Sequence, residues 1–339
     1  MKRIIVIRFS AMGDVAMVAS VLTEFQKQHG DTEIVLVSRK LFAAFFEHIP
    51  RLIFHPIDPK GKHKGLSGLF RLFRELKVHK PDYVADLHNN IRSKVLGTLF
   101  RLKGNNLCTL YKGRAEKKSL TRPHNKIKRQ LKPTTERYAD VFRQLGYSLK
   151  LDHELPRINR EAPEEYAAVF ASGIKTIGIA PFAQHPYKVF PLAKMEDLIR
   201  QLSEKNYTVF LFGGGAAEKE ICANWSNEYK QVVNTIGQYS LTEELDIIAN
   251  LDLMVSMDSS GMHIASLVGT RCVSIWGATH PFAGFLGYGQ SLEDCVQVAH
   301  PARPSSVYGN KPCDCDGVEA IDLVTVEMVV ERINKVVGL

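Results

Sequence analysis

Short apolar runs alternate with segments of helical spacing along most of this chain, and this alternation predicts its elements. Apolar runs of strand length occupy residues 4–8, 33–38, 83–87, 176–180, 208–212, 232–234, 253–255 and 272–276. Apolar side chains at helical spacing predict helices over residues 15–28, 41–48, 69–78, 135–145, 192–205, 216–226, 242–249, 264–268 and 324–336. Strands that alternate with helices are typical of α/β folds with parallel sheets, so we predict that fold class.

The length of the chain and one proline-containing segment predict how these elements divide. A chain of 339 residues exceeds a typical single domain. Residues 152–163 contain two prolines and are the best linker candidate. We therefore predict an N-terminal parallel-sheet domain over residues 1–155, a C-terminal one over residues 162–322 and a final helix over residues 323–339.

The most informative polar turn is Asp258-Ser259-Ser260-Gly261-Met262-His263, which follows the apolar run at residues 253–255. Ligands of open α/β sheets bind where strands end at their carboxyl edge. We expect Ser259 or Ser260 to cap the next helix, and Gly261 to let a ligand approach the backbone. The helix N–H groups would then favour an anion such as a diphosphate. An ordinary helix cap beside a core histidine, His263, accounts for the same pattern, and local chemistry does not choose between them.

Glycine placement argues against a dinucleotide-binding oxidoreductase. After the first strand Gly13 stands alone, and after the strand at 208–212 the glycines at 213–215 are followed by Glu218. Neither turn has the GxGxxG pattern of dinucleotide sites. Asp14 lies where the loop after the first strand presents side chains to a ligand, although it equally fits a helix cap.

The positive charge is concentrated in one stretch. Residues 101–132 hold eleven lysines and arginines and one acid, Glu116, so this stretch carries +10 and the rest of the +8 chain is close to balance. A basic region on a neutral body favours an anionic partner, which is a nucleic acid, a membrane surface or a phosphorylated glycolipid; a solvated loop is the plainer alternative. Tyr111 is the only aromatic residue in the stretch, so a stacking platform for bases is missing and we expect no nucleic acid.

Neither cysteine spacing nor hydropathy adds a cofactor or a membrane span. The six cysteines form no CxxC pair, and Cys313-Asp314-Cys315 with Cys295 and His300 is spaced too irregularly to favour a metal over free thiols. We expect no cofactor and no metal, since no paired-carboxylate site for Mg²⁺ stands out. No apolar run approaches ~18 residues, and the chain passes from Met1 directly into a strand. We therefore expect a cytoplasmic protein.

Taken together, the order of these motifs resembles glycosyltransferase family 9, the ADP-heptose:lipopolysaccharide heptosyltransferases. The resemblance covers nearly the whole chain. It rests on Ser10-Ala11-Met12-Gly13-Asp14, Asp86-Leu87-His88 with Arg92-Ser93, Lys188 before Phe190-Pro191, Gly213-Gly214-Gly215 with Glu218, Leu241, residues 258–263, and Gly277 with Pro281. One departure is that the family commonly has Asp-Ser-Gly-Pro-Met-His where this chain has Ser260-Gly261 before Met262. The glycine is displaced by one position, and this position affects how closely the diphosphate can approach the turn. The resemblance implies the GT-B architecture, two Rossmann-like domains facing a cleft.

The resemblance also implies roles for individual residues in an inverting transfer. Such a transfer passes through an oxocarbenium-like state and needs a base for the acceptor hydroxyl and positive groups for the leaving diphosphate. Asp14 is the implied base, and Ser10, Gly13, His88 and Arg92 the implied acceptor-binding residues of the N-terminal domain. The implied donor-binding residues of the C-terminal domain are Lys188, Glu218 (toward the ribose), Asp258, Ser259, Ser260, Gly261, Met262 and His263.

The implied donor is a nucleotide sugar, ADP-heptose, and the implied acceptor an anionic glycolipid, Kdo-lipid A or a heptose of the lipopolysaccharide inner core. Such an acceptor implies work at the inner face of the cytoplasmic membrane as a peripheral protein. Two alternatives stay open. One is a related GT-B transferase or epimerase that uses a different nucleotide sugar, and the other is a basic nucleic-acid-binding protein without enzymatic activity.

Overall fold

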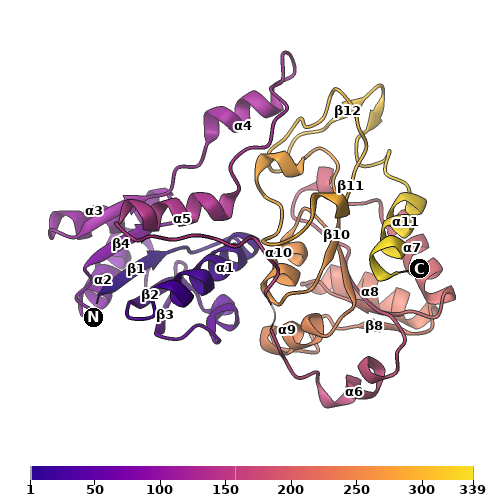
Figure 1. The fold of residues 1–339 in the computed structure, drawn as a ribbon, viewed down its shortest axis with the longest axis horizontal. Helices are drawn as coiled ribbons and strands as arrows, with labels where there is room; N and C mark the ends of the chain where they lie inside the picture. Colours follow the sequence, from indigo (N-terminus) through magenta and orange to yellow (C-terminus); the bar gives the residue numbers. More distant parts are fainter. Residues whose placement is uncertain (1, 157, 339) are drawn as a thin grey trace. The chain divides into compact units, whose positions relative to one another are not determined.

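The protein consists of two compact α/β units in a computed structural model that describes residues 2–156 and 158–338 (Figure 1). The first unit comprises the chain up to Lys112 together with Thr134–His153, and the second comprises Gly113–Pro133 together with the chain from Glu154 onward. The segment Gly113–Pro133, which we expected in an N-terminal domain over residues 1–155, therefore belongs to the second unit. Arg157, within the expected linker, lies outside the described residues.

The first unit is built on a five-stranded parallel sheet with strand order β3-β2-β1-β4-β5. Its strands are β1 (Arg3–Ile7), β2 (Glu33–Arg39), β3 (Leu52–Ile57), β4 (Tyr83–Asp86) and β5 (Asn106–Thr109). Its helices are α1 (Met12–Gln28), the 3₁₀ helix η1 (Lys40–Phe46), α2 (Gly65–Lys77), α3 (Ile91–Leu102) and α5 (Thr134–Gln144). The central strand β1 is fully buried from Ile4 to Ile7, as expected of a parallel strand covered on both faces.

The second unit is built on a six-stranded parallel sheet with strand order β11-β10-β9-β6-β7-β8. Its strands are β6 (Thr176–Ala180), β7 (Thr208–Leu211), β8 (Val232–Asn234), β9 (Leu253–Met257), β10 (Cys272–Ile275) and β11 (Cys295–Val296), with a hairpin of β12 (Asp314–Cys315) and β13 (Val318–Glu319). Its helices are α4 (Arg114–Thr121), α6 (Glu164–Ala171), α7 (Leu192–Glu204), α8 (Ala216–Glu228), α9 (Leu241–Ala249), α10 (Ser260–Leu267) and α11 (Val326–Val337), with the 3₁₀ helices η2 (Pro186–Lys188), η3 (Pro281–Ala283) and η4 (Leu292–Asp294).

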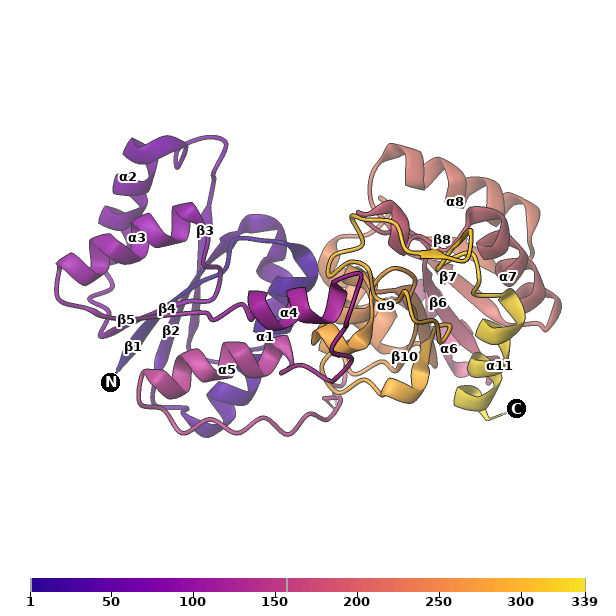
Figure 2. The ribbon, with the colours of Figure 1, turned by 90° about the horizontal axis from the view of Figure 1, so that it is seen from above.

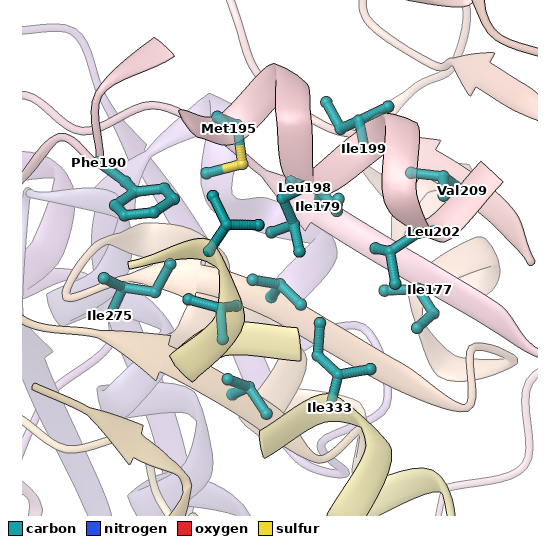
Figure 3. Close-up of a cluster of buried hydrophobic side chains, with 14 of the residues drawn as sticks. Ile177, Ile179, Phe190, Met195, Leu198, Ile199, Leu202, Val209, Ile275 and Ile333 are labelled. Carbon is teal, nitrogen blue, oxygen red and sulfur yellow. The ribbon is translucent and has the colours of Figure 1, made fainter. Parts of the chain in front are cut away.

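An apolar cluster under α7 and α11 stabilises the second sheet (Figure 3). Helix α7 contributes Leu198 and Leu202, both fully buried. Helix α11 buries residues at i, i+3, i+4 and i+7 of one face, from Val326 to Ile333. The final helix predicted from residue 323 onward is thus an integral part of the second unit.

The basic stretch is partly a structural element of the second unit. Leu120 and Leu131 pack with Ala283, and the Leu131 N–H donates to the Phe282 carbonyl at 2.9 Å. Lys126 Nζ donates to carbonyl oxygens of the 302–304 segment, at 2.8 Å for Pro304. These contacts exclude a uniformly solvated loop. None of the helices in the described part of the chain combines the length and the apolar character that crossing a bilayer requires.

Candidate functional site

The Asp14 carboxylate is held from two sides in the first unit. It is the third residue of α1, directly after the loop that follows β1. Its Oδ2 forms an ion pair with Nη2 of Arg8, and its Oδ1 accepts a hydrogen bond from the Tyr138 hydroxyl of α5 at 3.1 Å. The Asp14 side chain stays 28% exposed whereas that of Arg8 is 8% exposed. The arrangement presents an oriented, solvent-accessible carboxylate at the carboxyl end of the central strand.

Arg8 links this carboxylate to the turn after β4. Its Nη1 donates to the Leu87 carbonyl at 2.8 Å, and the next N–H, that of Phe9, donates to Nδ1 of His88 at 3.0 Å. Burial, reinforced by the charges of Arg8 and Lys112, lowers the pKa of His88 to about 3. His88 is therefore neutral at physiological pH, as its acceptor role at Nδ1 requires.

Asp86, the last residue of β4, stabilises the same turn through hydrogen bonds. Its Oδ1 accepts from the backbone N–H groups of His88 (2.9 Å) and Asn89 (2.8 Å), and its Oδ2 accepts from the Ser93 hydroxyl at 2.9 Å. Burial raises the pKa of Asp86 despite these hydrogen bonds. Asp86 thus positions His88 and the start of α3.

The other expected acceptor-side residues lie at the same edge of the sheet. Ser10 and Gly13 are half-buried on the two sides of the α1 N-terminus. Arg92 is the second residue of α3 and is exposed. Asn90 and Ser93, on either side of this part of the sequence, form the capping box of α3. All of them follow the carboxyl ends of β1 and β4, which are adjacent strands.

In the second unit Lys188 and Asp258 form a buried pair. Lys188 Nζ lies 2.8 Å from Oδ2 of Asp258 and donates at 2.8 Å to the Asp258 carbonyl. A Cβ on Gly309 would lie 2.4 Å from Cγ of Lys188, so this glycine allows the loop to pack on the lysine stem. Lys188 Nζ thus makes one hydrogen bond and one ion pair, both to Asp258, and these contacts hold the lysine at the N-terminus of α10.

The turn at residues 258–263 differs from the expected helix cap. Ser259 is the N-cap residue of α10, but its hydroxyl contacts the Ser256 hydroxyl at 3.0 Å and makes no bond to the helix N–H groups. A Cβ on Gly261 would lie 2.6 Å from that of Ala180 and 2.7 Å from Oγ of Ser256. Gly261 therefore packs α10 tightly onto β6 and β9.

Burial divides this turn into a ligand-accessible part and a core part. Met262 is fully buried and His263 is 6% exposed, so both belong to the packing of α10. Ser259 and Ser260 are half-buried and remain reachable. Ser259 and Ser260 are thus the residues of this turn that can meet a ligand, at a helix N-terminus that favours an anion.

Glu218 closes the glycine turn after β7. It is the third residue of α8, and its Oε2 accepts the Gly214 N–H at 2.7 Å. A Cβ on Gly213 would lie 2.9 Å from the same oxygen, so a larger residue would displace the carboxylate. A carboxylate has about four acceptor positions. Glu218 can therefore hold this turn and still accept a hydroxyl of a ligand.

A hollow of about 410 Å³ opens where β10 and β11 end. His280, His300 and Arg303 line it, with Lys128 of the basic stretch. Burial, together with the charges of Arg303 and Lys128, lowers the pKa of His280 to about 4, so this histidine is neutral at physiological pH. Lys128 and Arg303 therefore bring positive charge to the hollow, whereas His280 does not.

Cys313 and Cys315 are buried free thiols that pack with Ala278 and Ala320. In the described residues no group of three or more His, Cys, Asp or Glu side chains is arranged to hold a metal ion. The arrangement of these two cysteines is that of core side chains.

Sequence reasoning missed two residues of this site, Arg8 and Tyr138. Arg8 carried a local signal, because a cation that directly follows a buried apolar strand needs a nearby acid. Tyr138 carried none, since it lies 124 residues from Asp14.

Comparison with known proteins identifies what this arrangement resembles. The family model described as "Glycosyltransferase family 9 (heptosyltransferase)" matches residues 69–311. Lipooligosaccharide heptosyltransferase 2 of Haemophilus influenzae is 29% identical over 168 residues, 48% of this chain and 47% of that protein. The lipopolysaccharide core heptosyltransferase OpsX of the same organism is 21% identical over 295 residues, 83% of this chain and 80% of that protein. The chain thus spans about half the length of the first relative and four fifths of the second.

Solved structures show the same fold. The family 9 glycosyltransferase of Veillonella parvula matches with a TM-score of 0.73 at 20% identity, over 99% of this chain and 97% of that one. The E. coli heptosyltransferase WaaC with ADP-2-deoxy-2-fluoro heptose matches with a TM-score of 0.66 at 17% identity, over 98% and 99%. Two parallel-sheet α/β units with these neighbours are the GT-B architecture, as the family resemblance implied.

Proposed function

Because the chain belongs to glycosyltransferase family 9, we propose that this glycosyltransferase moves a heptose from ADP-heptose to the inner core of lipopolysaccharide, with inversion at the anomeric carbon. The acceptor is a Kdo-lipid A or a heptose already attached to it. Relatives named for lipopolysaccharide heptose transfer support the reaction class. A related protein studied with an ADP-heptose analogue supports the donor.

The observation that carries the proposal is the chemical contrast between the carboxyl edges of the two sheets. The first unit presents the oriented carboxylate of Asp14. The second presents the ammonium of Lys188 at the N-terminus of α10. A base and an anion-binding group are what transfer from a nucleotide sugar requires.

In this reaction Asp14 takes the proton of the attacking acceptor hydroxyl. Arg8 and Tyr138 hold the carboxylate and act as positioning residues. Ser10, Gly13, His88 and Arg92 form the acceptor side, and the exposed cations of the basic stretch meet the phosphates and carboxylates of the glycolipid. As the bond between the anomeric carbon and the diphosphate breaks, the sugar gains oxocarbenium character and the nucleoside diphosphate leaves. Lys188 and the N-terminus of α10 stabilise the negative charge of the leaving diphosphate.

On the donor side, Glu218 accepts a ribose hydroxyl while it keeps its bond to Gly214. Ser259 and Ser260 line the diphosphate, and Asp258 orients Lys188. Gly261, Met262 and His263 act indirectly, because they seat α10 on the sheet. The reaction takes place in the cytoplasm at the inner face of the cytoplasmic membrane, where such a glycolipid is exposed.

Calorimetry with ADP, UDP and GDP, followed by a transfer assay with ADP-heptose and Kdo-lipid A, tests the proposal. We expect ADP to bind at least tenfold more tightly than the other two and the assay to yield heptosylated product. A preference for UDP or GDP would keep the GT-B fold and discard ADP-heptose as donor. Binding of none of the three would discard the nucleotide-sugar reaction itself.

A further inference from the structure

Helix α2 of the first unit exposes large apolar side chains to solvent. Leu66 is 66% exposed and Phe70, one turn later on the same face, is 52% exposed. Another side of α2 buries Leu69, Leu72 and Leu76, and Leu72 and Leu76 pack in the apolar cluster of the first sheet. Packing within the unit therefore accounts for this buried stripe, whereas more than half of the surface of Leu66 and of Phe70 stays in solvent.

The exposed charges of α2 itself are all positive. Arg71, Arg74 and Lys77 are exposed on α2, and no acid of the helix is exposed. The one acid of α2, Glu75, is half-buried and turned to the preceding loop. That loop adds three more exposed cations, Lys60, Lys62 and Lys64, and one exposed acid, Asp58, whose carboxylate accepts backbone N–H groups of the loop itself.

The lysine loop, residues 58–64, packs against α2. His63 is fully buried; its Nδ1 accepts the Asp58 N–H at 3.0 Å and its Nε2 lies 3.1 Å from Oε2 of Glu75. A Cβ on Gly68 would lie 2.3 Å from the His63 carbonyl carbon, so only glycine lets helix and loop pack this closely. Burial opposes ionisation of Glu75, but hydrogen bonds from two histidines and a lysine outweigh it and lower its pKa. The loop cations are therefore held beside Leu66 and Phe70.

The neighbouring helix extends the same pattern. Helix α3 packs against α2 (Figure 2), and both begin at the carboxyl edge of the sheet. The first residue of α3, Ile91, is 82% exposed and is followed by exposed Arg92 and Lys94. Apolar side chains surrounded by cations thus recur along one edge of the unit.

We propose that the solvent side of α2, formed by Leu66, Phe70, Arg71, Arg74, Lys77 and the lysine loop, docks on the surface of an anionic lipid bilayer. Cations on one face with Leu and Phe between them are the composition of helices that lie in the bilayer interface. A nucleic acid would satisfy the cations but offers no apolar phase for Leu66 and Phe70. The inference rests on the proposed function, which supplies the membrane, and assigns the contact to α2 rather than to the basic stretch.

A tryptophan at position 70 reports this contact directly. The chain has two tryptophans, Trp225 and Trp276, which are 4% and 1% exposed. In Phe70→Trp the new indole is in water, and we expect its emission to shift to the blue on addition of phosphatidylglycerol vesicles. Unchanged emission in a sample that sediments with the vesicles would overturn the proposal, because binding would then use another surface.

Paired variants compare the two basic surfaces. Arg71→Gln/Arg74→Gln should weaken vesicle binding about fivefold per cation, and Leu66→Ser/Phe70→Ser at least tenfold. The matched control is Arg114→Gln/Lys118→Gln, which removes two exposed cations from α4 and should leave vesicle binding almost unchanged. The reverse outcome, loss with the α4 variant alone, would assign the membrane contact to the basic stretch.

Two further measurements distinguish a failure of the membrane-docking proposal from a failure of the proposed transferase function. ADP affinity is measured by calorimetry without lipid, and transfer is measured on a detergent-dispersed acceptor. We expect the α2 variants to keep both while they lose vesicle binding. Loss of ADP binding in these variants would indicate misfolding, in which case Phe70→Trp alone decides; intact vesicle binding in all of them would overturn the docking surface and leave the transferase proposal standing.

Discussion

Replacement of Lys188 by methionine tests whether its pair with Asp258 is as buried as its geometry indicates. The side chains of Lys188 and Asp258 are 15% and 4% exposed, and Nζ lies 2.8 Å from Oδ2. Lys188→Met leaves a buried carboxylate without its cation, a change that costs about 3–5 kcal/mol in buried pairs. Because the lysine is not fully buried, we expect the lower end, about 3 kcal/mol. For a unit of this size that lowers the Tm by roughly 6–12 °C.

The double variant Lys188→Met/Asp258→Asn separates the ion pair from the rest of the site. Removal of both charges leaves no unpaired charge, so we expect a free energy of unfolding within about 1 kcal/mol of wild type. Lys194→Met is the matched control, since Lys194 donates to main-chain carbonyls, at 2.8 Å for Val324, and should cost less than about 1 kcal/mol. Urea unfolding gives these values and ADP calorimetry gives binding. Binding should fall in both Lys188 variants, whereas stability recovers only in the double one.

Two results would refute this reasoning. If Lys188→Met unfolded within about 1 kcal/mol of wild type, solvent would be screening the pair, as it does at protein surfaces. If the double variant were no more stable than the single one, the cost would come from lost packing of the lysine stem rather than from the unpaired charge.

The other predictions concern three residues of the same sites. Asp14→Asn should lower turnover by roughly 10²-fold with an unchanged ADP Kd; near-normal turnover would remove Asp14 from the role of base. Gly261→Ala should destabilise the protein by about 1–3 kcal/mol in urea, because its Cβ would lie 2.6 Å from that of Ala180, whereas Gly214→Ala, with open space, should cost little. Since the pKa of folded His88 is lowered to about 3, the unfolded chain binds the proton first as the pH falls below about 6.5. The contribution of neutral His88 to the free energy of unfolding is therefore complete above about pH 6.5 and is lost as the pH falls toward 3, by at most about 1.4 kcal/mol per pH unit. Urea unfolding at pH 7 and pH 5 should show this dependence on pH, and His88→Asn should reduce it.

The central strands were predictable because strands that are buried on both faces consist mostly of apolar residues, which appear in the sequence as apolar runs. The strand predicted at residues 176–180 is β6, Thr176–Ala180, without any shift. The strands β3 and β5 were missed, and both lie at the edges of the first sheet. Only Ile57 of β3 is buried, and the strand contains His55 and Pro56, so its pattern is that of a loop. Edge strands depend on their neighbour's hydrogen bonds more than on their own hydrophobicity.

The candidate site was predictable where it follows strand ends and not where it depends on distant partners. Asp14 and Asp258 were found because both follow a buried strand. The function of Gly261 could not be read locally, since glycine is equally required by an approaching ligand and by a close-packed neighbour such as Ala180. The charge run at 101–132 likewise gave no indication that Lys126 is bound to main-chain carbonyls 176 and 178 residues away.

The interleaved assignment of Gly113–Pro133 to the second unit bears on how the chain is made. The chain passes between the units at three points, so no single cut separates them, and a fragment that begins near residue 162 lacks a piece of its own fold. On the ribosome this piece emerges long before its partners: Lys126 meets the Ala302 carbonyl only 176 residues later. At 5–20 residues per second that interval is roughly 10–35 s. During this interval the part of the second unit that buries Leu120 and Leu131 has not yet been synthesised. We therefore expect the segment Gly113–Pro133 to be the part of the nascent chain that needs protection by a chaperone for the longest time.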